Sequence, residues 1–265
     1  MSELKNISKA YYINLDRDRK RRLYMERSLP FRAERFSAFD GLNTKMATKE
    51  RNLFKLNPPK NSKRFLRWKG KLKGEQKGLI ISHYQLWKQL VADKEATNYF
   101  ILEDDAVFKK TFVQEWNNHY ARNMPNDYLV IFPGGISLKR YFKHDKFTKQ
   151  FNKYYKTIRK NKVDGDYGKP RRYCHVNTQS YIINKAAAIM LCTMAEKHGF
   201  HASIEDYMLQ VFAGGVDLKF SKLHKSPTRI YHTDPQMVFQ LDEINNFLHQ
   251  TIRTNQLLLD YPYDS

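Results

Sequence analysis

The sequence predicts an α/β fold built on a mostly parallel central sheet flanked by helices. The chain opens with a strand-like segment at 10–15, a helical pattern at 17–29 and a second strand-like segment at 31–39. This β-α-β order favours a parallel pair, because a helix between two strands carries the chain back to the starting edge of the sheet. Further apolar strand-like runs then alternate with helical patterns, which is typical of the α/β class.

The first half of the chain has clear element boundaries. Pro30 ends the first helix, and Asp40-Gly41 is a turn signal after the second strand. Residues 42–73 are irregular and basic, so we expect a long loop with short helical pieces. The expected core contacts of the first helix are Leu23, Met25 and Leu29.

A strong helix is expected from Gly78 onward. Apolar residues recur there at helical spacing and share one face, so Trp87 is predicted to pack in the core. The residues on that face are Leu79, Ser82, His83, Leu86, Trp87 and Leu90. The later expected elements are a strand at 99–102, a helix at 111–122, strands at 127–132 and 176–183, helices at 185–197 and 204–212, two short strands within 216–231, and a tail at 235–260 that is helical in part.

The chain is strongly basic, with 47 Lys and Arg against 27 Asp and Glu and a formal net charge of +20. Such a charge attracts polyanions and anionic surfaces. It is concentrated at 51–73 and at 139–162, and aromatic residues interleave the second block. That mixture can bind single-stranded nucleic acid, but neither block contains a nucleic-acid motif. We therefore expect solvated basic surfaces that contact at most an anionic surface, and no nucleic-acid partner.

The sequence also carries signals of location. No stretch approaches the roughly 18 apolar residues of a membrane helix, and the N-terminus lacks the apolar core of a secretory signal. Cys174 and Cys192 are the only cysteines, and we expect buried, reduced thiols rather than a disulfide or zinc ligands. These features predict a cytoplasmic protein. The abundance of Lys, Asn, Tyr and Phe suits an AT-rich genome, which indicates a bacterium or a virus-infected host cell.

Three consecutive acids, Glu103-Asp104-Asp105, directly follow the apolar run of the strand at 99–102. Adjacent like charges repel unless a cation or hydrogen-bond donors offset them. Carboxylates at the end of a strand in an α/β sheet lie where such folds bind ligands. A hard divalent cation that holds a diphosphate would suit this position. The alternative is a solvated acidic turn.

Several groups of residues follow one another in a characteristic order. They are Ile13-Asn14-Leu15-Asp16-Arg17 with Arg21, Phe36 to Gly41, Gly78 to Trp87, Ile101 to Asp105, Tyr128 to Phe132, Ser180 to Ala187, and Glu205 to Met208. Together they resemble glycosyltransferase family 25, which includes bacterial lipopolysaccharide and lipooligosaccharide galactosyltransferases and collagen hydroxylysine galactosyltransferases. The sequence departs from the family at Gln76, where a Gly-Glu pair usually supplies a Glu; Gly74-Glu75 lies one position upstream.

The resemblance implies a GT-A-type fold in a single catalytic domain over residues 1–265. Residues 8–135 would form the nucleotide-sugar-binding half, 136–235 the acceptor-binding half, and 236–265 a C-terminal tail. The implied reaction is an inverting transfer of galactose or glucose from a UDP-sugar, with Mn²⁺ or Mg²⁺ as the metal cofactor. The acceptor would be a hydroxyl of a glycan or of a glycosylated or hydroxylated peptide.

The acidic run supplies the expected metal site. Asp105 is the expected metal ligand, at the end of an Asp-x-Asp form in which Glu103 replaces the first acid. Glu103 and Asp104 are expected at the nucleotide, Glu103 as an acceptor for the ribose hydroxyls. His232 is the expected late metal or phosphate ligand; His224 and an ordinary surface histidine are the alternatives.

The ends of the first two strands supply further nucleotide contacts. Asn14 and Arg17 are expected there, because an arginine can hold phosphate through two parallel hydrogen bonds. Arg21 is expected on a solvated helix face. Asp40 meets the base or ribose in one interpretation and only forms a turn in the other.

Two helices carry the remaining candidates. Ser82 and His83 are expected at the diphosphate or the ribose, with a buried core histidine as the alternative for His83. Asp206 is the expected general base for the acceptor hydroxyl, and Glu205 is the second choice. In the alternative interpretation, both acids only stabilise the helix N-terminus.

Two other function classes stay open at this point. A metal-dependent nuclease or nucleic-acid-binding protein would use the same acids and the +20 charge. A transferase-like protein that only binds glycans would fit the departure at Gln76.

Overall fold

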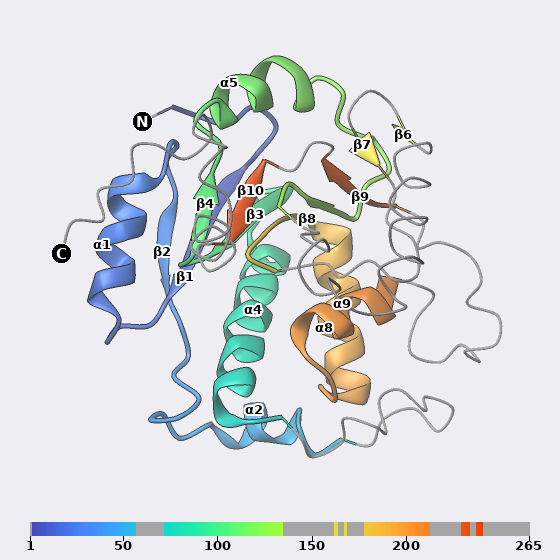
Figure 1. Ribbon diagram of the computed structural model, residues 1–265. Helices are drawn as coiled ribbons and strands as arrows, with labels where there is room; N and C mark the ends of the chain where they lie inside the picture. The colour runs from blue at the N-terminus through green and yellow to red at the C-terminus, as the bar shows by residue number, and fades with distance from the viewer. Residues whose placement is uncertain are drawn as a thin grey trace, which may run out of the picture.

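The computed structural model describes residues 2–56, 72–134, 162–163, 167–168, 178–212, 229–233 and 237–240. An eight-stranded sheet has the order β2-β1-β3-β8-β5-β9-β7-β6 and forms the centre of the molecule (Figure 1). Its strands are β1 (Lys9–Asn14), β2 (Glu34–Ser37), β3 (Asn98–Glu103), β5 (Val130–Phe132), β6 (Lys162–Val163), β7 (Tyr167–Gly168), β8 (Ser180–Asn184) and β9 (Ile230–Thr233).

The sheet is mixed but mostly parallel in direction. β1 pairs in parallel with β2 and with β3, and β5 pairs in parallel with β9. β8 runs antiparallel between β3 and β5, and β7 runs antiparallel to β9 and β6. β8 and β7 therefore run against the other six strands. The predicted α/β class with a mostly parallel sheet is confirmed.

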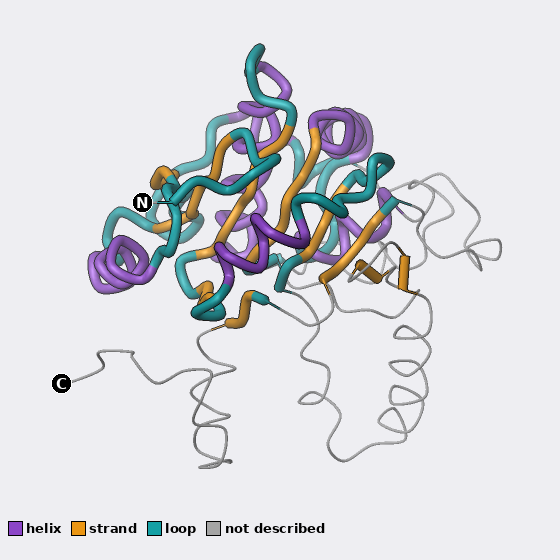
Figure 2. The backbone as a smooth tube through the Cα atoms, turned by 90° about the horizontal axis from the view of Figure 1, so that it is seen from above, coloured by secondary structure: helices purple, strands orange, loops and turns teal. Residues whose placement is uncertain are grey.

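Helices cover both faces of the sheet (Figure 2). One hydrophobic cluster joins the sheet to α4 (Gly74–Ala92), α8 (Lys185–His198) and α9 (Ile204–Phe212). A second cluster joins the other face to α1 (Arg19–Ser28), α5 (Phe112–Glu115) and the π-helix η1 (Trp116–Tyr120). The short helix α2 (Thr48–Asn52) lies in the predicted irregular segment.

Strand β3 shows why the sheet is buried on both sides. Tyr99 and Ile101 belong to the first cluster, whereas Phe100 and Leu102 belong to the second. Successive side chains of a strand point to opposite faces, so a continuous apolar run is the pattern of a strand covered on both sides. The same alternation places Glu103 on the face that α4 covers.

Helix α4 begins at Gly74, one turn before the predicted start. The side chain of Gln76 explains this, because its Oε1 accepts a hydrogen bond of 3.0 Å from the backbone N–H of Lys73 and caps the helix. Gly78 lies close to the chain after β2: a Cβ there would come within 2.6 Å of the Phe39 carbonyl oxygen and 2.7 Å of the Gly41 nitrogen. The capped helix start thus packs directly against the loop that carries Asp40.

Three of the element predictions need correction. Leu23 is 50% exposed and does not belong to the core; it lies two residues before the buried Met25 and so cannot share its helix face. The helix predicted at 111–122 is divided into α5 and η1. The described part of the tail contains a strand that the sequence did not predict, β10 (Val238–Gln240), which pairs antiparallel with β4 (Ala106–Phe108).

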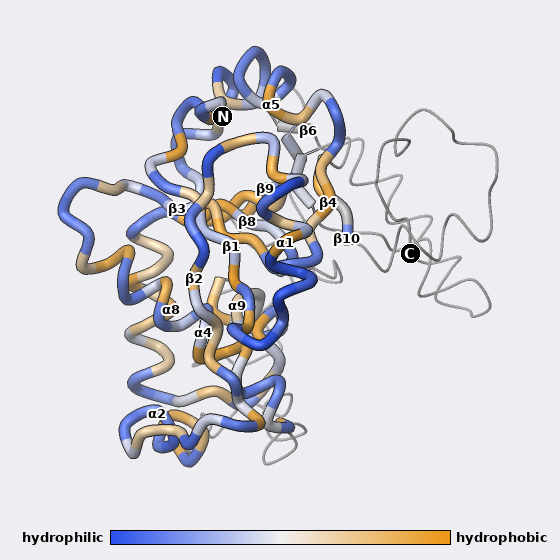
Figure 3. Tube along the Cα trace, turned by 90° about the vertical axis from the view of Figure 1, so that its left-hand side faces the viewer, coloured by the Kyte–Doolittle hydropathy of each residue, from blue (hydrophilic) through white to orange (hydrophobic). Residues whose placement is uncertain are grey.

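Other predictions agree with the structure or lie outside its described part. Met25 and Trp87 are completely buried, and α1 is coloured largely hydrophilic in Figure 3, as its basic sequence requires. Cys192 is buried and forms no disulfide, and burial raises the pKa of its thiol to about 12. Among the described helices, none is long and apolar enough to span a membrane. The predictions that lie outside the described residues concern Cys174, His224, residues 57–71 and 139–161 of the basic blocks, and the tail beyond 240.

Candidate functional site

Polar side chains gather where β1 and β3 end. Asn14 is the last residue of β1 and Glu103 the last residue of β3, and the two strands are parallel neighbours. Asp104 and Asp105 form the turn from β3 into β4. The sequence predicted this gathering, because the carboxyl ends of parallel strands meet at one edge of a sheet.

Asp104 is held by the protein itself. Its Oδ2 accepts a hydrogen bond of 2.8 Å from Asn14 Nδ2, and its Oδ1 accepts one of 2.8 Å from Arg21 NH1. Burial raises the pKa of this carboxyl, and the bonds from Asn14 and Arg21 oppose that rise only in part. Arg21 lies on an exposed helix face, as expected, and its guanidinium also neutralises the middle acid of the run.

Asp105 is the most buried acid of the run, with 5% of its surface exposed. Its Oδ2 accepts a hydrogen bond of 3.0 Å from Gln240 Nε2 on β10. Its Oδ1 is buried and has no hydrogen-bond partner among the residues that the structure describes. Burial, and then the neighbouring charge of Glu103, raise the pKa of this carboxyl to about 6. A buried carboxylate oxygen without a partner is unfavourable by itself and favours a bound cation.

The described residues fit a divalent cation that the protein holds through few ligands. Within them, no group of three or more His, Cys, Asp or Glu side chains converges as a metal cage. Mg²⁺ and similar hard cations commonly take one or two carboxylates, and substrate phosphates and water complete their coordination. Asp105 Oδ1 is the available carboxylate oxygen here, so Asp105 would hold the ion that the sequence predicts.

Glu103 lies against β8 rather than β1. Its Oε1 accepts a hydrogen bond of 2.6 Å from Thr178 Oγ1 and lies 3.6 Å from His83 Nε2. Burial alone would raise the pKa of Glu103, but His83, Thr178 and the charge of Arg21 outweigh it and lower the pKa. Glu103 is therefore an ionised acceptor inside the protein. Its hydrogen-bond partner lies on the β8 side of β3, whereas the predicted nucleotide contacts at the end of β1 lie on the other side of β3.

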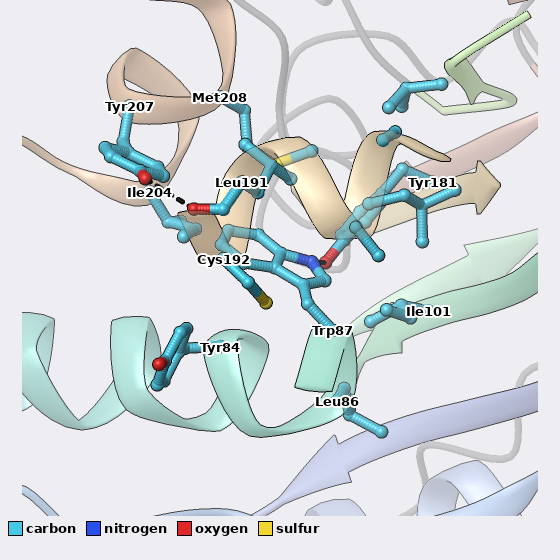
Figure 4. Close-up of a cluster of buried hydrophobic side chains, with 14 of the residues drawn as sticks. Tyr84, Leu86, Trp87, Ile101, Tyr181, Leu191, Cys192, Ile204, Tyr207 and Met208 are labelled. Atoms are coloured by element: carbon cyan, nitrogen blue, oxygen red, sulfur yellow. Dashed lines mark hydrogen bonds between the residues drawn. The ribbon is translucent and has the colours of Figure 1, made fainter. Parts of the chain in front are cut away.

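His83 is held in one orientation by a buried hydrogen-bond chain. Trp87 Nε1 donates to the Tyr181 hydroxyl at 2.9 Å, and that hydroxyl lies 2.7 Å from His83 Nδ1 (Figure 4 shows the Trp87–Tyr181 end). Burial raises the pKa of Tyr181 well above its ordinary value, so the hydroxyl keeps its proton. Because the Trp87 N–H can only donate, the hydroxyl accepts that bond; the arrangement that also uses the hydroxyl proton directs it to Nδ1 and leaves the ring hydrogen on Nε2.

Replacing Tyr181 with phenylalanine is expected to lower the free energy of unfolding by about 2–4 kcal/mol, because it leaves the Trp87 N–H and His83 Nδ1 buried without partners. Urea denaturation measures this change. Tyr84→Phe is the matched control: within the described ranges its hydroxyl makes one bond, to Glu196 Oε1 at 2.9 Å, so the expected loss is only about 1 kcal/mol. Equal losses in the two variants would contradict the hydrogen-bond chain.

The first turn of α9 brings Glu205 to the same cluster. Its Oε1 lies 3.5 Å from Thr178 Oγ1, and burial, followed by the charge of Glu103, raises the pKa of its carboxyl. Asp206 is the next residue, about 100° further around the helix, and its backbone N–H donates to Ser203 Oγ at 3.4 Å. Glu205 therefore contacts the Glu103–Thr178 pair through Thr178.

A separate pair lies at the outer strands of this edge. Arg17 forms an ion pair with Asp40, so the two residues predicted at the nucleotide do come together. Asp40 also forms a turn, in which its Oδ1 accepts from the backbone N–H groups of Leu42 and Asn43 at 3.1 and 3.2 Å. The turn predicted at Asp40 is confirmed, and its contact with the base or ribose stays a prediction.

Ser82 and His232 differ in their relation to the site. Ser82 is completely buried; its hydroxyl donates to the Gly78 carbonyl and accepts from Phe39 N–H, both at 2.9 Å. These bonds fix α4 against the chain after β2 and leave the hydroxyl without a proton to donate to a ligand. His232 is buried on β9, and β8 and β5 lie between β9 and β3. Its role as a metal or phosphate ligand stays a prediction.

Three residues of the site were missed in the sequence. Arg35 donates to Asn14 Oδ1 at 3.1 Å and pairs with Asp16. Thr178 bonds Glu103, and Gln240 bonds Asp105 from a position 135 residues away. The only sequence signal was that Thr178 lies near the start of the strand predicted at 176–183; Arg35 and Gln240 belong to no motif.

A cavity of about 730 Å³ lies at the other end of the strands, where β1 and β3 begin, and Ser8, Asn98 and Tyr128 line it. The Asn98 amide is fully used there: Nδ2 donates to the Asn6 carbonyl at 2.9 Å and to the Tyr128 hydroxyl at 3.0 Å, and Oδ1 accepts from Ser8 N–H at 2.9 Å. These groups satisfy one another. The candidate site is therefore the acidic edge, where buried polar atoms lack partners.

Comparison with known proteins gives one extended family match. The model of glycosyltransferase family 25, described as an LPS biosynthesis protein, matches residues 7–208. The curated protein "Putative glycosyltransferase R655" of Acanthamoeba polyphaga mimivirus is 29% identical over 127 residues, which is 46% of this chain and 36% of that protein. The match thus spans about a third of that relative's length.

Two solved structures are also similar. Mouse xyloside xylosyltransferase 1 aligns with a TM-score of 0.38 and 11% identity over 87% of this chain and 82% of that one. A glycosyltransferase involved in the glycosylation of the major capsid of PBCV-1 aligns with a TM-score of 0.38 and 8% identity over 92% and 98%. TM-scores this low do not establish a common fold, so the fold assignment depends on the sheet and helices described above.

Proposed function

The chain belongs to glycosyltransferase family 25, and from this premise we propose that it transfers galactose or glucose from a UDP-sugar to a hydroxyl of a glycan or of a glycosylated or hydroxylated peptide. The α/β architecture, with its mostly parallel sheet and its acids at the carboxyl ends of the strands, agrees with the expected GT-A-type fold. The observation that carries the proposal is Asp105 Oδ1, which is buried and has no hydrogen-bond partner among the described residues. The two neighbouring acids already have partners: Asp104 bonds Asn14, and Glu103 bonds Thr178.

The nucleotide would lie over β1 and β2. Arg17 and Arg21 are there with half-exposed side chains, 47% and 44%, and guanidinium groups bind phosphate oxygens through paired hydrogen bonds. Asp105 would hold Mn²⁺ or Mg²⁺, which when bound neutralises charge on the diphosphate as it leaves. Asn14 and Arg21 keep Asp104 from repelling that diphosphate, because they bond both of its oxygens.

Glu205 would act as the general base in place of the first predicted choice, Asp206. In an inverting transfer the acceptor hydroxyl gives its proton to the base, its oxygen bonds the anomeric carbon, and the bond from that carbon to the UDP oxygen breaks with its electron pair on UDP. A base is most effective when its pKa is near the working pH. The raised pKa of Glu205 supports this role.

The experiment that tests the proposal is incubation with Mn²⁺ and a panel of UDP-sugars, with UDP release as the readout. We expect release from UDP-galactose or UDP-glucose, an increase with added glycan acceptors, and none after a chelator is added. Cleavage of nucleic acid without UDP release would instead support the nuclease alternative. UDP-sugar binding without any release, with every acceptor tried, would support a glycan-binding protein that has lost catalysis.

A further inference from the structure

Gln179 has a buried side-chain amide. The residue is 1% exposed, and within the described part of the chain neither its Oε1 nor its Nε2 has a hydrogen-bond partner. Buried side-chain amides nearly always make hydrogen bonds, so two orphaned atoms on one amide require an explanation. The amide lies directly before β8, and its backbone carbonyl accepts a bond of 3.0 Å from Glu103 N–H.

This backbone bond places Gln179 beside Glu103. The bond follows the antiparallel pairing of Leu102 with Ser180 and of Ile101 with Tyr181, and it joins the end of β3 to the turn before β8. The same turn brings Thr178 Oγ1 within 2.6 Å of Glu103 Oε1. The buried Gln179 amide therefore belongs to the surroundings of the Glu103 carboxylate.

His83 supplies a second such group beside Glu103. Among the described residues its buried Nε2 has no hydrogen-bond partner, and it lies 3.6 Å from Glu103 Oε1, beyond hydrogen-bond length. Since Nδ1 takes the Tyr181 proton, Nε2 carries a hydrogen and is a donor. The surroundings of Glu103 thus hold one N–H donor, one carboxylate acceptor and one amide that can both donate and accept. This set matches neighbouring hydroxyl groups of a sugar ring, each of which also donates and accepts.

The order of the strands indicates that these groups would meet the sugar of the donor. Arg17 and Asp40 follow β1 and β2, Asp105 follows β3, and Gln179 precedes β8, the next strand in the sheet. A UDP-sugar has its nucleoside, diphosphate and sugar in the same linear order. With the nucleoside over β1 and β2 and the diphosphate at Asp105, the transferred sugar would lie over β8.

We propose that Gln179, with His83 and Glu103, binds the hydroxyl groups of the sugar that is transferred. The inference depends on the proposed function, because it takes the donor to be a UDP-sugar. The competing explanation is a buried water molecule that bonds the same atoms, which would give Gln179 no influence on the donor.

The test separates the sugar from the nucleotide. Calorimetry with Mn²⁺ present measures the Kd of UDP, of UDP-galactose and of UDP-glucose. The Kd of UDP is then divided by the Kd of whichever UDP-sugar binds more tightly, and this ratio reports how much the sugar contributes to binding. In Gln179→Met, which keeps the length of the side chain and removes its hydrogen bonds, we expect that ratio to fall by about 5- to 10-fold. The UDP affinity should stay within about twofold.

Gln85→Met is the matched control, because its amide lies on α4 and has its own partner, Glu50 Oε1, at 2.9 Å; its ratio should equal that of the wild type. If Gln179→Met does not fold, Gln179→Asn shortens the amide and should lower the ratio in the same direction. If the Gln179 variant keeps the wild-type ratio, or weakens the binding of UDP as much as that of the UDP-sugar, this inference is wrong and the proposed function is unaffected. A wild-type protein that binds neither UDP nor UDP-sugar overturns the proposed function and this inference with it.

Discussion

Replacing Asp105 with asparagine is expected to abolish sugar transfer and, at the same time, to stabilise the metal-free protein at neutral pH. Asparagine keeps the shape of the side chain but removes the charge that would hold the cation. Transition-state stabilisation by a metal amounts to several kcal/mol, so transfer should fall by at least about 10²- to 10³-fold.

The gain in stability follows from the raised pKa of Asp105, which is about 6. Between the ordinary pKa of an aspartate and this value, the folded protein binds the proton more tightly than the unfolded chain does. The free energy of unfolding therefore decreases as the pH rises through this window, and above it the ionised carboxylate lowers stability by up to about 3 kcal/mol. The asparagine variant avoids this loss.

Urea denaturation in the presence of a chelator checks the prediction. The variant should be more stable than the wild type at pH 7.5, and the difference should shrink as the pH falls toward 4. Asp127→Asn, whose carboxylate bonds the Tyr231 hydroxyl at 2.5 Å near the opposite edge of the sheet, should leave transfer largely intact. An Asp105→Asn protein with wild-type transfer would show that Asp105 holds no essential cation.

Replacing Glu205 with glutamine should lower kcat by about 10²- to 10⁴-fold, the range for loss of a general base. The Kd of the donor should not change, because the base acts on the acceptor. Single-turnover measurements of transfer and calorimetry of UDP-sugar binding check the two parts. In the wild type, burial and the Glu103 charge raise the pKa of Glu205, so kcat should begin to decline on acidification at a higher pH than an ordinary glutamate would give.

Asp206→Asn is the matched control, since it makes the same chemical change one residue further along α9. We expect a loss of less than about tenfold, within the range of a change near the helix N-terminus. A larger loss in Asp206→Asn than in Glu205→Gln would reverse the assignment and return the role to the residue that the sequence favoured first.

The sequence predicted the acidic edge of the site well because that edge depends on local order. Asn14 and Glu103 end neighbouring strands of a β-α-β start, and parallel strands bring their carboxyl ends together whatever the loops between them do. The buried Trp87 was predictable for a similar reason, since helical spacing alone places it on the apolar face of α4.

The partners of the acids could not be predicted, because long-range pairing selects them. In the sequence, Arg21 is one of several arginines on a basic helix. Only the packing of α1 beside β4 brings it to Asp104. Gln240 reaches Asp105 because β10 pairs with β4, which no local pattern in the tail indicates. The preference for Glu205 over Asp206 depends on the position of Thr178, whose strand begins later than the sequence suggested.

The most direct test of the account is anomalous diffraction from a crystal soaked with MnCl₂ and UDP. The account predicts a manganese peak in direct coordination with Asp105 and with the UDP diphosphate, and a uridine over the ends of β1 and β2 near Arg17. Manganese and UDP bound at another place, with Asp105 still bonded only to Gln240, would contradict it.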